Sequence, residues 1–323
     1  MIIAKYKDIE LSLRAMGPRY ANFIRMVAIR PDGRERVLAE WFPNLITDFG
    51  LNAMGTYGIQ QQVQYCLVGT GITTPAVTDT AMDSHVASAS AVSGSLTGAA
   101  LGVDPYYNYQ VQRYRFAVGA AAGNLSEVGF SRTSTNDALF SRARIKDGGG
   151  SPTTITVLSD EILDVYYEVR RYPELTDTPY SMDIAGVTYS GVIRASEVTS
   201  GPASTGHAAM CGVPRLLYAN TGGSTTPSTY LYSGAIGTVT QRPSGTGGGS
   251  SYVQYSTYSN NSLYTDNTAT FGLDNGNVGG ANSIYVPTSA GAFQMSVSPV
   301  IPKDNTKILT LNIRVGQWGR YTP

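Results

Sequence analysis

The stretch ILDVYYEVRR, Ile162 to Arg171, contains the clearest strand pattern in the chain. Apolar and polar side chains alternate along it, and a period of two is typical of a strand with one buried face. We expect one face to lie in a core and the opposite face to be solvated. The predicted core face is Leu163, Val165, Tyr167 and Val169, and the predicted wet face is Asp164, Tyr166, Glu168 and Arg170.

Similar runs lie on both sides of this stretch, separated by glycine and proline turn signals. Phe23 to Ile29 and Arg36 to Ile46 flank Pro31-Asp32-Gly33, which predicts a β-hairpin. A short helix is expected between Gly50 and Gly55, and helix should cover less than roughly a fifth of the residues. Further strands are expected at Val63 to Val68, Tyr106 to Val118, Glu127 to Ser131, Leu139 to Ile145, Met182 to Ile193, Ala292 to Val300 and Lys307 to Val315.

The chain has 323 residues, which favours two domains. A polar joint bracketed by prolines, Pro173 to Pro179, precedes a shift toward Gly, Ser, Thr, Tyr and Asn. We therefore predict an all-β protein with two β-sandwich (jelly-roll-like) domains, residues 1–175 and 176–323, with long Gly/Ser/Thr-rich loops that include the region from Gly201 to Asn282. The strand pairs that end the two domains are similar in pattern, which suggests a duplication.

Charge and cysteine content restrict the class of protein. Lys+Arg and Asp+Glu both number 23, so the net charge is zero, which argues against nucleic acid or an anionic membrane as the main partner. Cys66 and Cys211 are too few for a disulfide framework, and we expect two reduced, buried thiols. The first 14 residues lack the apolar core of a signal peptide, and no apolar run suits a membrane span. We expect a soluble protein made in a cytoplasm.

The sequence contains no recognisable catalytic, cofactor or metal motif. His85 and His207 lie far from any nucleophile motif, and the glycine-rich stretches lack the remaining residues of a nucleotide-binding loop. Glycoside hydrolysis needs two carboxyl groups in a cleft. The one acidic cluster is better explained as a strand face with cross-strand ion pairs, so no catalytic residue, cofactor or metal is predicted. This cluster consists of Asp160, Glu161, Asp164 and Glu168.

Two sets of residues are candidates for binding partners. Tyrosines within the Gly/Ser/Thr-rich region combine a large contact area with a low entropic cost, although cross-strand packing explains them equally well. The first 40 residues carry a modest positive excess that suits an acidic docking partner or a solvated face. The candidate partner-binding residues are Tyr218, Tyr230, Tyr232, Tyr252, Tyr255, Tyr258 and Tyr264, and the candidate docking residues are Arg14, Arg19, Arg25 and Arg30.

Several segments resemble structural proteins of tailed-bacteriophage virions, the group usually described as tail-fibre or appendage proteins. They cover most of the chain up to about Pro173, and beyond it the likeness returns between Lys303 and Arg320. The matching stretches are Trp41 to Thr47 with Gly50-Leu51, Cys66 to Gly71 with Thr78 to Ala81, Tyr114 to Phe116 with Gly123 to Gly129, Leu139 to Ala143, and Thr156 to Val165.

The resemblance implies a non-enzymatic virion component, a tail or collar appendage that bears fibres or contacts the host. Its expected partners are other virion proteins (tail, collar or portal-proximal) and its own subunits in a homo-oligomer, with neither nucleic acid nor membrane insertion. It would be located in the virion after synthesis in the cytoplasm of a host bacterium. A host-glycan-binding receptor module and a capsid decoration or head-fibre protein remain open as alternatives, as does an appended glycan-cleaving enzyme.

Overall fold

The computed structural model describes residues 4–5, 9–12, 17–184, 186–199, 212–214, 218–221, 224–227 and 229–322. It is 52% strand and 5% helix, which confirms the predicted all-β class. The chain forms two compact units. We call Tyr20–Gly98, Tyr109–Arg170 and Arg320–Pro323 the curled-sheet unit, and Met1–Arg19, Ala99–Asn108 and Arg171–Gly319 the two-sheet unit.

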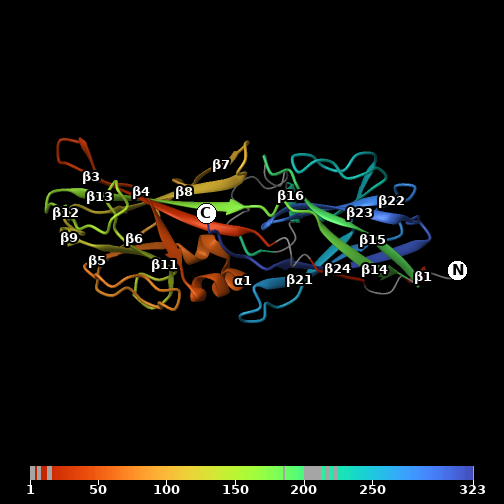
Figure 1. Cartoon of the computed structure of the whole chain (residues 1–323), viewed down its shortest axis with the longest axis horizontal. Coiled ribbons are helices and arrows are strands. Elements are labelled where there is room, and N and C mark those ends of the chain that lie inside the picture. The colour runs from red at the N-terminus through yellow and green to blue at the C-terminus, as the bar shows by residue number, and fades with distance from the viewer. Residues whose placement is uncertain are drawn as a thin grey trace. The chain divides into compact units, whose positions relative to one another are not determined.

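The curled-sheet unit is built on one large sheet (Figure 1). Ala91, just after the first strand in spatial order, bridges Tyr114 near the other end, so the sheet curls until its ends meet. The strand order is β6 (His85–Ser90), β5 (Tyr65–Gly69), β10 (Glu127–Ser131), β11 (Leu139–Arg144), β4 (Glu35–Ile46), β3 (Arg19–Ile29), β13 (Ile162–Tyr172), β8 (Tyr107–Phe116) and β7 (Thr97–Leu101), with β25 (Gly319–Arg320) paired to β3.

Aromatic rings fill the core of the curled sheet. The ring centroids of Phe130 and Tyr167 are 3.8 Å apart and stacked, and Tyr114 meets Phe130 edge-on at 5.2 Å. The predicted core face of β13 is confirmed, because all four of its side chains are buried. The predicted hairpin is confirmed as β3 and β4, which pair antiparallel across the turn at Gly33.

One helix, α1 (Asp48–Gln62), contains the short helix that the sequence predicts. Thr47 caps its start, because its Oγ1 accepts a hydrogen bond from the Gly50 amide at 2.9 Å. A Cβ atom on Gly50 would lie 2.2 Å from the backbone oxygen of Phe140, so the close approach of α1 to β11 requires glycine there. Leu51, Met54 and Ile59 are buried.

The predicted wet face of β13 is wrong. Asp164 is 1% exposed and Glu168 is 8% exposed, whereas Tyr166 and Arg170 are half-buried, so the second face of the strand is largely covered. Burial of these carboxylates is tolerated because arginines pair with them: Arg115 holds Asp164 with two hydrogen bonds, and Arg170 bonds to Glu168. The predicted ion pairs are present, and each joins a covered carboxylate to an arginine whose side chain is partly exposed, 40% for Arg115 and 26% for Arg170.

The two-sheet unit contains two sheets that share one apolar core. Ile284 and Met295 face that core from one sheet, and Leu311 and Ile313 from the other. The six-stranded sheet has the order β14 (Thr178–Ile184), β15 (Val187–Ser196), β23 (Gly291–Ile301), β22 (Ala281–Thr288), β18 (Tyr230–Tyr232) and β19 (Gly247–Gly249). The five-stranded sheet has β1 (Ala4–Lys5), β24 (Lys307–Gly316), β21 (Tyr264–Phe271) and β20 (Tyr252–Tyr255), with β2 (Ile9–Ser12) also on β24.

The region from Gly201 to Asn282 was expected to be long loops, and this expectation is wrong in part. It contains β18 to β21, and a separate hairpin of β16 (Tyr218–Thr221) and β17 (Ser224–Pro227). The two strand pairs that suggested a duplication are arranged differently in the two units. In the curled-sheet unit β11 and β13 belong to one sheet, whereas β23 and β24 belong to different sheets.

Candidate interaction site

Three of the four acidic residues in the cluster around β13 form ion pairs with arginines: Glu161, Asp164 and Glu168. Nη2 of Arg36 lies 2.6 Å from Oε2 of Glu161, and these hydrogen bonds hold the pKa of Glu161 below its ordinary value. Arg115 grips Asp164 through Nε at 2.7 Å and Nη2 at 2.6 Å. In this part of the cluster each buried carboxylate is balanced by an arginine from a neighbouring strand, which gives it a structural role.

Among the residues that the structure describes, no three His, Cys, Asp or Glu side chains are grouped in a way that suits a metal ion. Likewise, no helix within the described residues is long and apolar enough to cross a membrane. Cys66 is a free, buried thiol whose pKa is raised by burial, as predicted for it. His85 is half-buried on β6, whereas His207 and Cys211 lie outside the described residues.

The structure separates the seven candidate tyrosines into different environments. Tyr230 and Tyr232 flank Leu231, which faces the core of the two-sheet unit. The ring centroid of Tyr230 lies 6.3 Å from that of Tyr285, a buried tyrosine that the sequence analysis did not select. The guanidinium of Arg242 lies 4.7 Å from the ring centroid of Tyr285.

Four of the other tyrosines belong to the five-stranded sheet or its flanking loops. Tyr255 packs partly against the core, and Tyr258 lies 5.9 Å from Trp318 between ring centroids. Tyr264 stacks under Arg314 at 3.9 Å, and Tyr252 is 55% exposed. Tyr218 is on β16, but its side chain lies outside the described residues. The tyrosines therefore do not form one continuous patch.

A polar hollow of about 290 Å³ lies on the five-stranded sheet. It is lined by Asp266, which pairs with Arg314 at 2.7 Å, and by Thr268, which donates to Asn312 at 2.9 Å. Hydroxyl, amide and charged groups on a sheet surface, with Tyr264 beside them, suit a hydroxyl-rich ligand.

The candidate docking arginines are also dispersed. Arg25 pairs with Glu40 at 3.2 Å, and Arg30 lies 3.9 Å from Glu161, both in the curled-sheet unit. Arg19 belongs to the two-sheet unit and donates to the Gln317 carbonyl at 3.1 Å. Arg14 lies outside the described residues.

The curled-sheet unit has a feature that the sequence analysis missed, a split between β4 and its neighbour. On one side β4 pairs with β3 along most of its length, but on the other it pairs with β11 only at Leu45 and Ile46. After β11 the chain no longer pairs with β4. Residues 146–154 form a connection that leads to β12 (Ile155–Val157), which pairs with β9 (Gly123–Leu125). The Gly148-Gly149-Gly150 run was the signal for this excursion.

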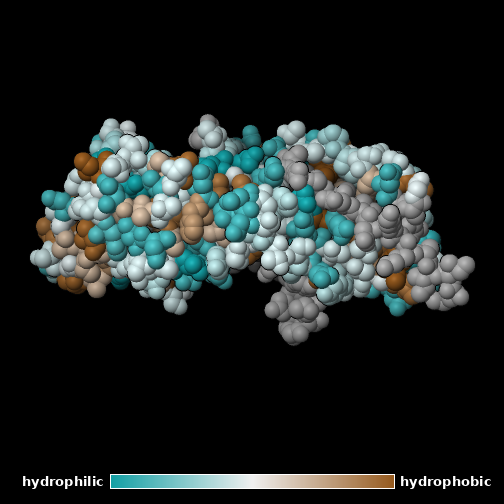
Figure 2. All heavy atoms as spheres, turned by 90° about the horizontal axis from the view of Figure 1, so that it is seen from below, coloured by the Kyte–Doolittle hydropathy of each residue, from teal (hydrophilic) through white to brown (hydrophobic). Residues whose placement is uncertain are grey.

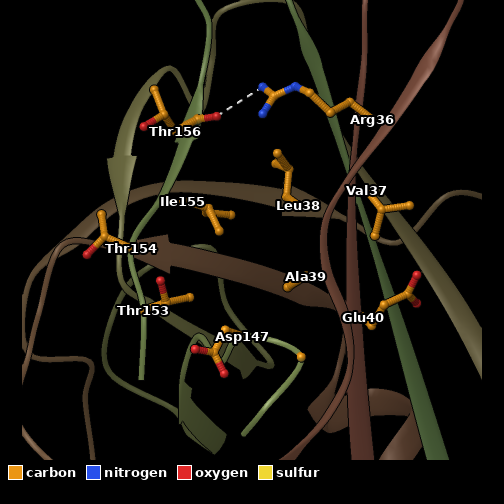
Figure 3. A pocket seen from close by; sticks show the side chains of 11 residues that line it. Arg36, Val37, Leu38, Ala39, Glu40, Asp147, Thr153, Thr154, Ile155 and Thr156 are labelled. Carbon is orange, nitrogen blue, oxygen red and sulfur yellow. Dashed lines mark hydrogen bonds between the residues drawn. The ribbon is translucent and has the colours of Figure 1, made fainter. Parts of the chain in front are cut away.

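A hollow of about 480 Å³ occupies this split, and we call it the β4 slot (Figure 3). One wall is Arg36–Glu40 of β4, and the other is residues 153–156, with Asp147 and Gly148 at one end. The side chains of Leu38 and Ile155 lie between the two walls in Figure 3. Arg36 closes the opposite end, because its Nη2 donates to the Thr156 carbonyl at 3.1 Å.

A second hollow of about 400 Å³ continues along β4 beyond the slot. It is lined by Pro43, Asn44 and Leu45 on one side and by Arg144 and Lys146 on the other. Elsewhere, the face in Figure 2 shows hydrophobic residues in small patches separated by hydrophilic and neutral ones. The two hollows along β4 are therefore the concave features of the curled-sheet unit that we consider as a site.

Comparisons with known proteins found no matching family, no similar curated protein and no similar solved structure.

Proposed function

We propose that this chain is a non-enzymatic structural component of a bacteriophage virion, an appendage on the tail or collar. The observation that carries the proposal is the placement of the segments that resemble virion proteins. The stretches quoted up to Val165 all belong to the curled-sheet unit. A resemblance concentrated in one compact unit is what a shared attachment domain would produce.

In this proposal the curled-sheet unit is held by the particle, and the two-sheet unit, with the candidate tyrosines, is directed outward. The proposal retains two jelly-roll-like β-sandwiches as the domain type and a homo-oligomer as the assembled form. The two sheets over one apolar core support a sandwich for the two-sheet unit. Closed rings or trimers fit an appendage whose surface is free for subunit contacts.

The proposal is tested by electron microscopy of virions produced from the genome that encodes this chain, labelled with an antibody against it. Label at the tail or collar is the expected result. Label spread over the capsid would favour a decoration or head-fibre protein, and particles without the chain would overturn the proposal. A strictly monomeric mass, both at high micromolar concentration and in particles, would overturn the oligomer.

The polar hollow on the five-stranded sheet favours a second candidate function, binding of a host surface glycan. Glycan-array binding by the full chain, compared between wild type, Tyr264→Ala and Tyr232→Ala, tests it. Loss of binding in Tyr264→Ala alone is expected, because Tyr264 stacks on an arginine of the hollow whereas Tyr232 belongs to the other sheet. Equal binding by all three proteins would argue against this site.

A further inference from the structure

We propose that the hollow of about 400 Å³ beyond the β4 slot binds an acidic segment of a partner polypeptide. We call it the basic hollow, after the cations that line it. Its lining comes from three parts of the curled-sheet unit, namely residues 43–45 of β4, residues 74–75, and six residues between 142 and 152. The inference does not depend on the virion assignment, because it rests on the charges and the lining of this hollow alone.

Three cations line the basic hollow, and no carboxylate does so among the residues that the structure describes. The cations are Arg142, Arg144 and Lys146. Arg142 is balanced, because its Nη1 lies 2.8 Å from Oδ2 of Asp79 and its Nε lies 2.9 Å from Oε2 of Glu127. Within the described part of the chain, Arg144 and Lys146 have no carboxylate partner. The hollow therefore carries two positive charges that the chain itself does not pair.

The other carboxylates near these cations are engaged with backbone amides. Asp147 follows Lys146 in the chain, and its Oδ1 accepts hydrogen bonds from two amides of its own turn at 2.9 Å. Asp83 accepts hydrogen bonds from two amides of the loop that carries Thr74, at 3.0 and 3.2 Å. A carboxylate from outside the chain is therefore the group that can pair with Arg144 and Lys146.

Arg144 is held in place without being fully solvated. Its side chain is half-buried, and its Nη1 donates a hydrogen bond to the Ile72 carbonyl. Its Nε is buried and has no hydrogen-bond partner within the described residues. A guanidinium that is fixed and partly removed from water attracts a nearby carboxylate more strongly than a hydrated one does. Arg144 therefore suits recognition of an acidic group.

The rest of the lining is largely aliphatic, and its walls are fixed before a ligand arrives. The apolar side chains are Pro43, Leu45, Pro75, Ala143 and Pro152. Proline fixes the backbone dihedral φ, so these walls lose little freedom on binding.

Hydrogen bonds also fix the two turns beside the hollow. Nη2 of Arg142 donates to Oγ1 of Thr73 at 2.7 Å. On the other side, the Thr153 amide donates to the Ile145 carbonyl at 2.8 Å. The hollow is thus pre-formed, which lowers the entropic cost of binding.

This lining favours a peptide over an acidic sugar or an inorganic anion. Apart from the cations, the lining side chains that can form hydrogen bonds are Asn44 and Thr74, so most hydroxyls of a sugar would remain unpaired. Phosphate would meet the charges but would leave the aliphatic walls exposed to water. A glutamate flanked by aliphatic residues satisfies both parts of the hollow. The predicted ligand is a segment of this kind in a partner protein.

The test uses the full chain and two acetylated and amidated peptides, Ala-Leu-Glu-Leu-Ala and Ala-Leu-Gln-Leu-Ala. NMR titration follows their binding. We expect the glutamate peptide to bind at least about fivefold more tightly, because it alone can pair with the cations. Shifted amide signals should be confined to residues 43–45, 72–75 and 142–152. Added NaCl should weaken binding of the glutamate peptide and change binding of the glutamine peptide little.

Matched variants separate the basic hollow from general attraction. Lys146→Gln should weaken binding of the glutamate peptide about threefold to tenfold, whereas Lys146→Arg, which keeps the charge, should retain it. Arg34→Gln removes a cation from a side chain that is 74% exposed and lies outside the hollow, so it should not affect binding. Thermal melting of the three variants verifies that the fold is retained.

Several results would overturn the inference. They are absence of binding by the glutamate peptide at millimolar concentration, equal affinity of the two peptides, equal affinity of Lys146→Gln and Arg34→Gln, and shifted signals away from the hollow. Binding of phosphate or glucuronate at the same residues, as tightly as the glutamate peptide, would identify a small anion or an acidic sugar as the occupant and would also overturn it.

Discussion

Strand β13 in the curled-sheet unit and strand β24 in the two-sheet unit have similar alternating sequences but different surroundings. In β24 one face is buried, with Leu309, Leu311, Ile313 and Val315 at most 1% exposed, and the residues between them are half-buried. In β13 the corresponding apolar face is buried as well, but Asp164 and Glu168 on the opposite face are also covered. Alternation identifies the core face of a strand, and it does not establish that the other face is wet.

The difference arises from what lies over the second face. In the curled-sheet unit, strands and loops distant in sequence bring arginines and amides to buried carboxylates. Glu127 is fully buried, bonds to Arg142 at 2.9 Å and accepts hydrogen bonds from the amides of Gly71, Asp83 and Ser84. These bonds hold the loop of residues 70–84 over β10 and β11. In the core of the two-sheet unit, buried apolar side chains predominate.

Both β13 and β24 have a buried apolar face. A charge placed on that face should cause the largest loss in the free energy of unfolding. Val165→Asp should cost more than about 4 kcal/mol, because it buries an unpaired carboxylate in a packed core. Val187→Asp, at a residue 45% exposed, is the matched control and should change little. Chemical denaturation measures both variants. If Val165→Asp unfolds at the same denaturant concentration as the control, the assignment of the core face of β13 is wrong.

Substitutions on the polar faces of β13 and β24 should destabilise the two units to different extents. Asp164→Ala should cost about 2 kcal/mol, because it removes two hydrogen bonds from Arg115, whose side chain is 40% exposed and can be hydrated in the variant. Asn312→Ala on β24 removes one bond with Thr268 and should cost about 1 kcal/mol or less. Urea unfolding of both variants gives the two values. Equal losses would show that the outer faces of β13 and β24 have the same energetic weight.

Much of the strand layout could be predicted from the sequence because its signals are local. The period of two and the turn at Gly33 are sufficient for β3, β4 and β13. The partner of Asp164 could not be predicted in this way, because Arg115 is 49 residues away and its approach depends on the pairing of β8 with β13. The same limit applies to Glu127 and the distant loop that it holds.

The strands between Gly201 and Asn282 escaped prediction for a different reason. In β21 the outward positions carry tyrosine, aspartate and threonine, and the buried positions include Thr265 and Asn267, so the apolar alternation is weak. The tyrosines were recognised by composition, but their separation depends on which sheet each strand joins. The β4 slot could not be predicted, because it forms where residues 146–154 cease to pair with β4. The only sequence signal was the glycine run Gly148-Gly149-Gly150 in that segment.

Acid should reveal the buried ion pairs of the curled-sheet unit. Hydrogen bonds from Arg36 lower the folded-state pKa of Glu161 below its ordinary 4.5, so the stabilisation is present above that pH and is lost as the pH falls through the folded pKa. Glu161→Gln should therefore cost about 2 kcal/mol near neutral pH, and the gap from wild type should close in acid. Urea unfolding across this pH range measures the gap.

Asp177 provides the comparison in the two-sheet unit. Its pKa is also lowered, by Arg194, but its side chain is 35% exposed, so solvent screens the pair. The difference in unfolding free energy between Asp177→Asn and wild type should be smaller than for Glu161→Gln. It should close as the pH falls through the lowered pKa of Asp177. A gap for Glu161→Gln that stays constant as the pH falls would mean that the ion pair is not the source of its stabilisation.

The smallest effect should come from exchanging arginine for lysine on the outer faces. Lysine keeps the charge but loses the paired N–H groups and the flat stacking surface of arginine. Arg115→Lys should cost about 1–2 kcal/mol, because buried Asp164 would keep one hydrogen bond of two. Arg314→Lys should cost less than about 1 kcal/mol, since Asp266 is 43% exposed and the contact with Tyr264 is a single cation–π interaction. Denaturation of the two variants under identical conditions gives the order, and a larger loss for Arg314→Lys would place the stronger outer-face electrostatics in the two-sheet unit.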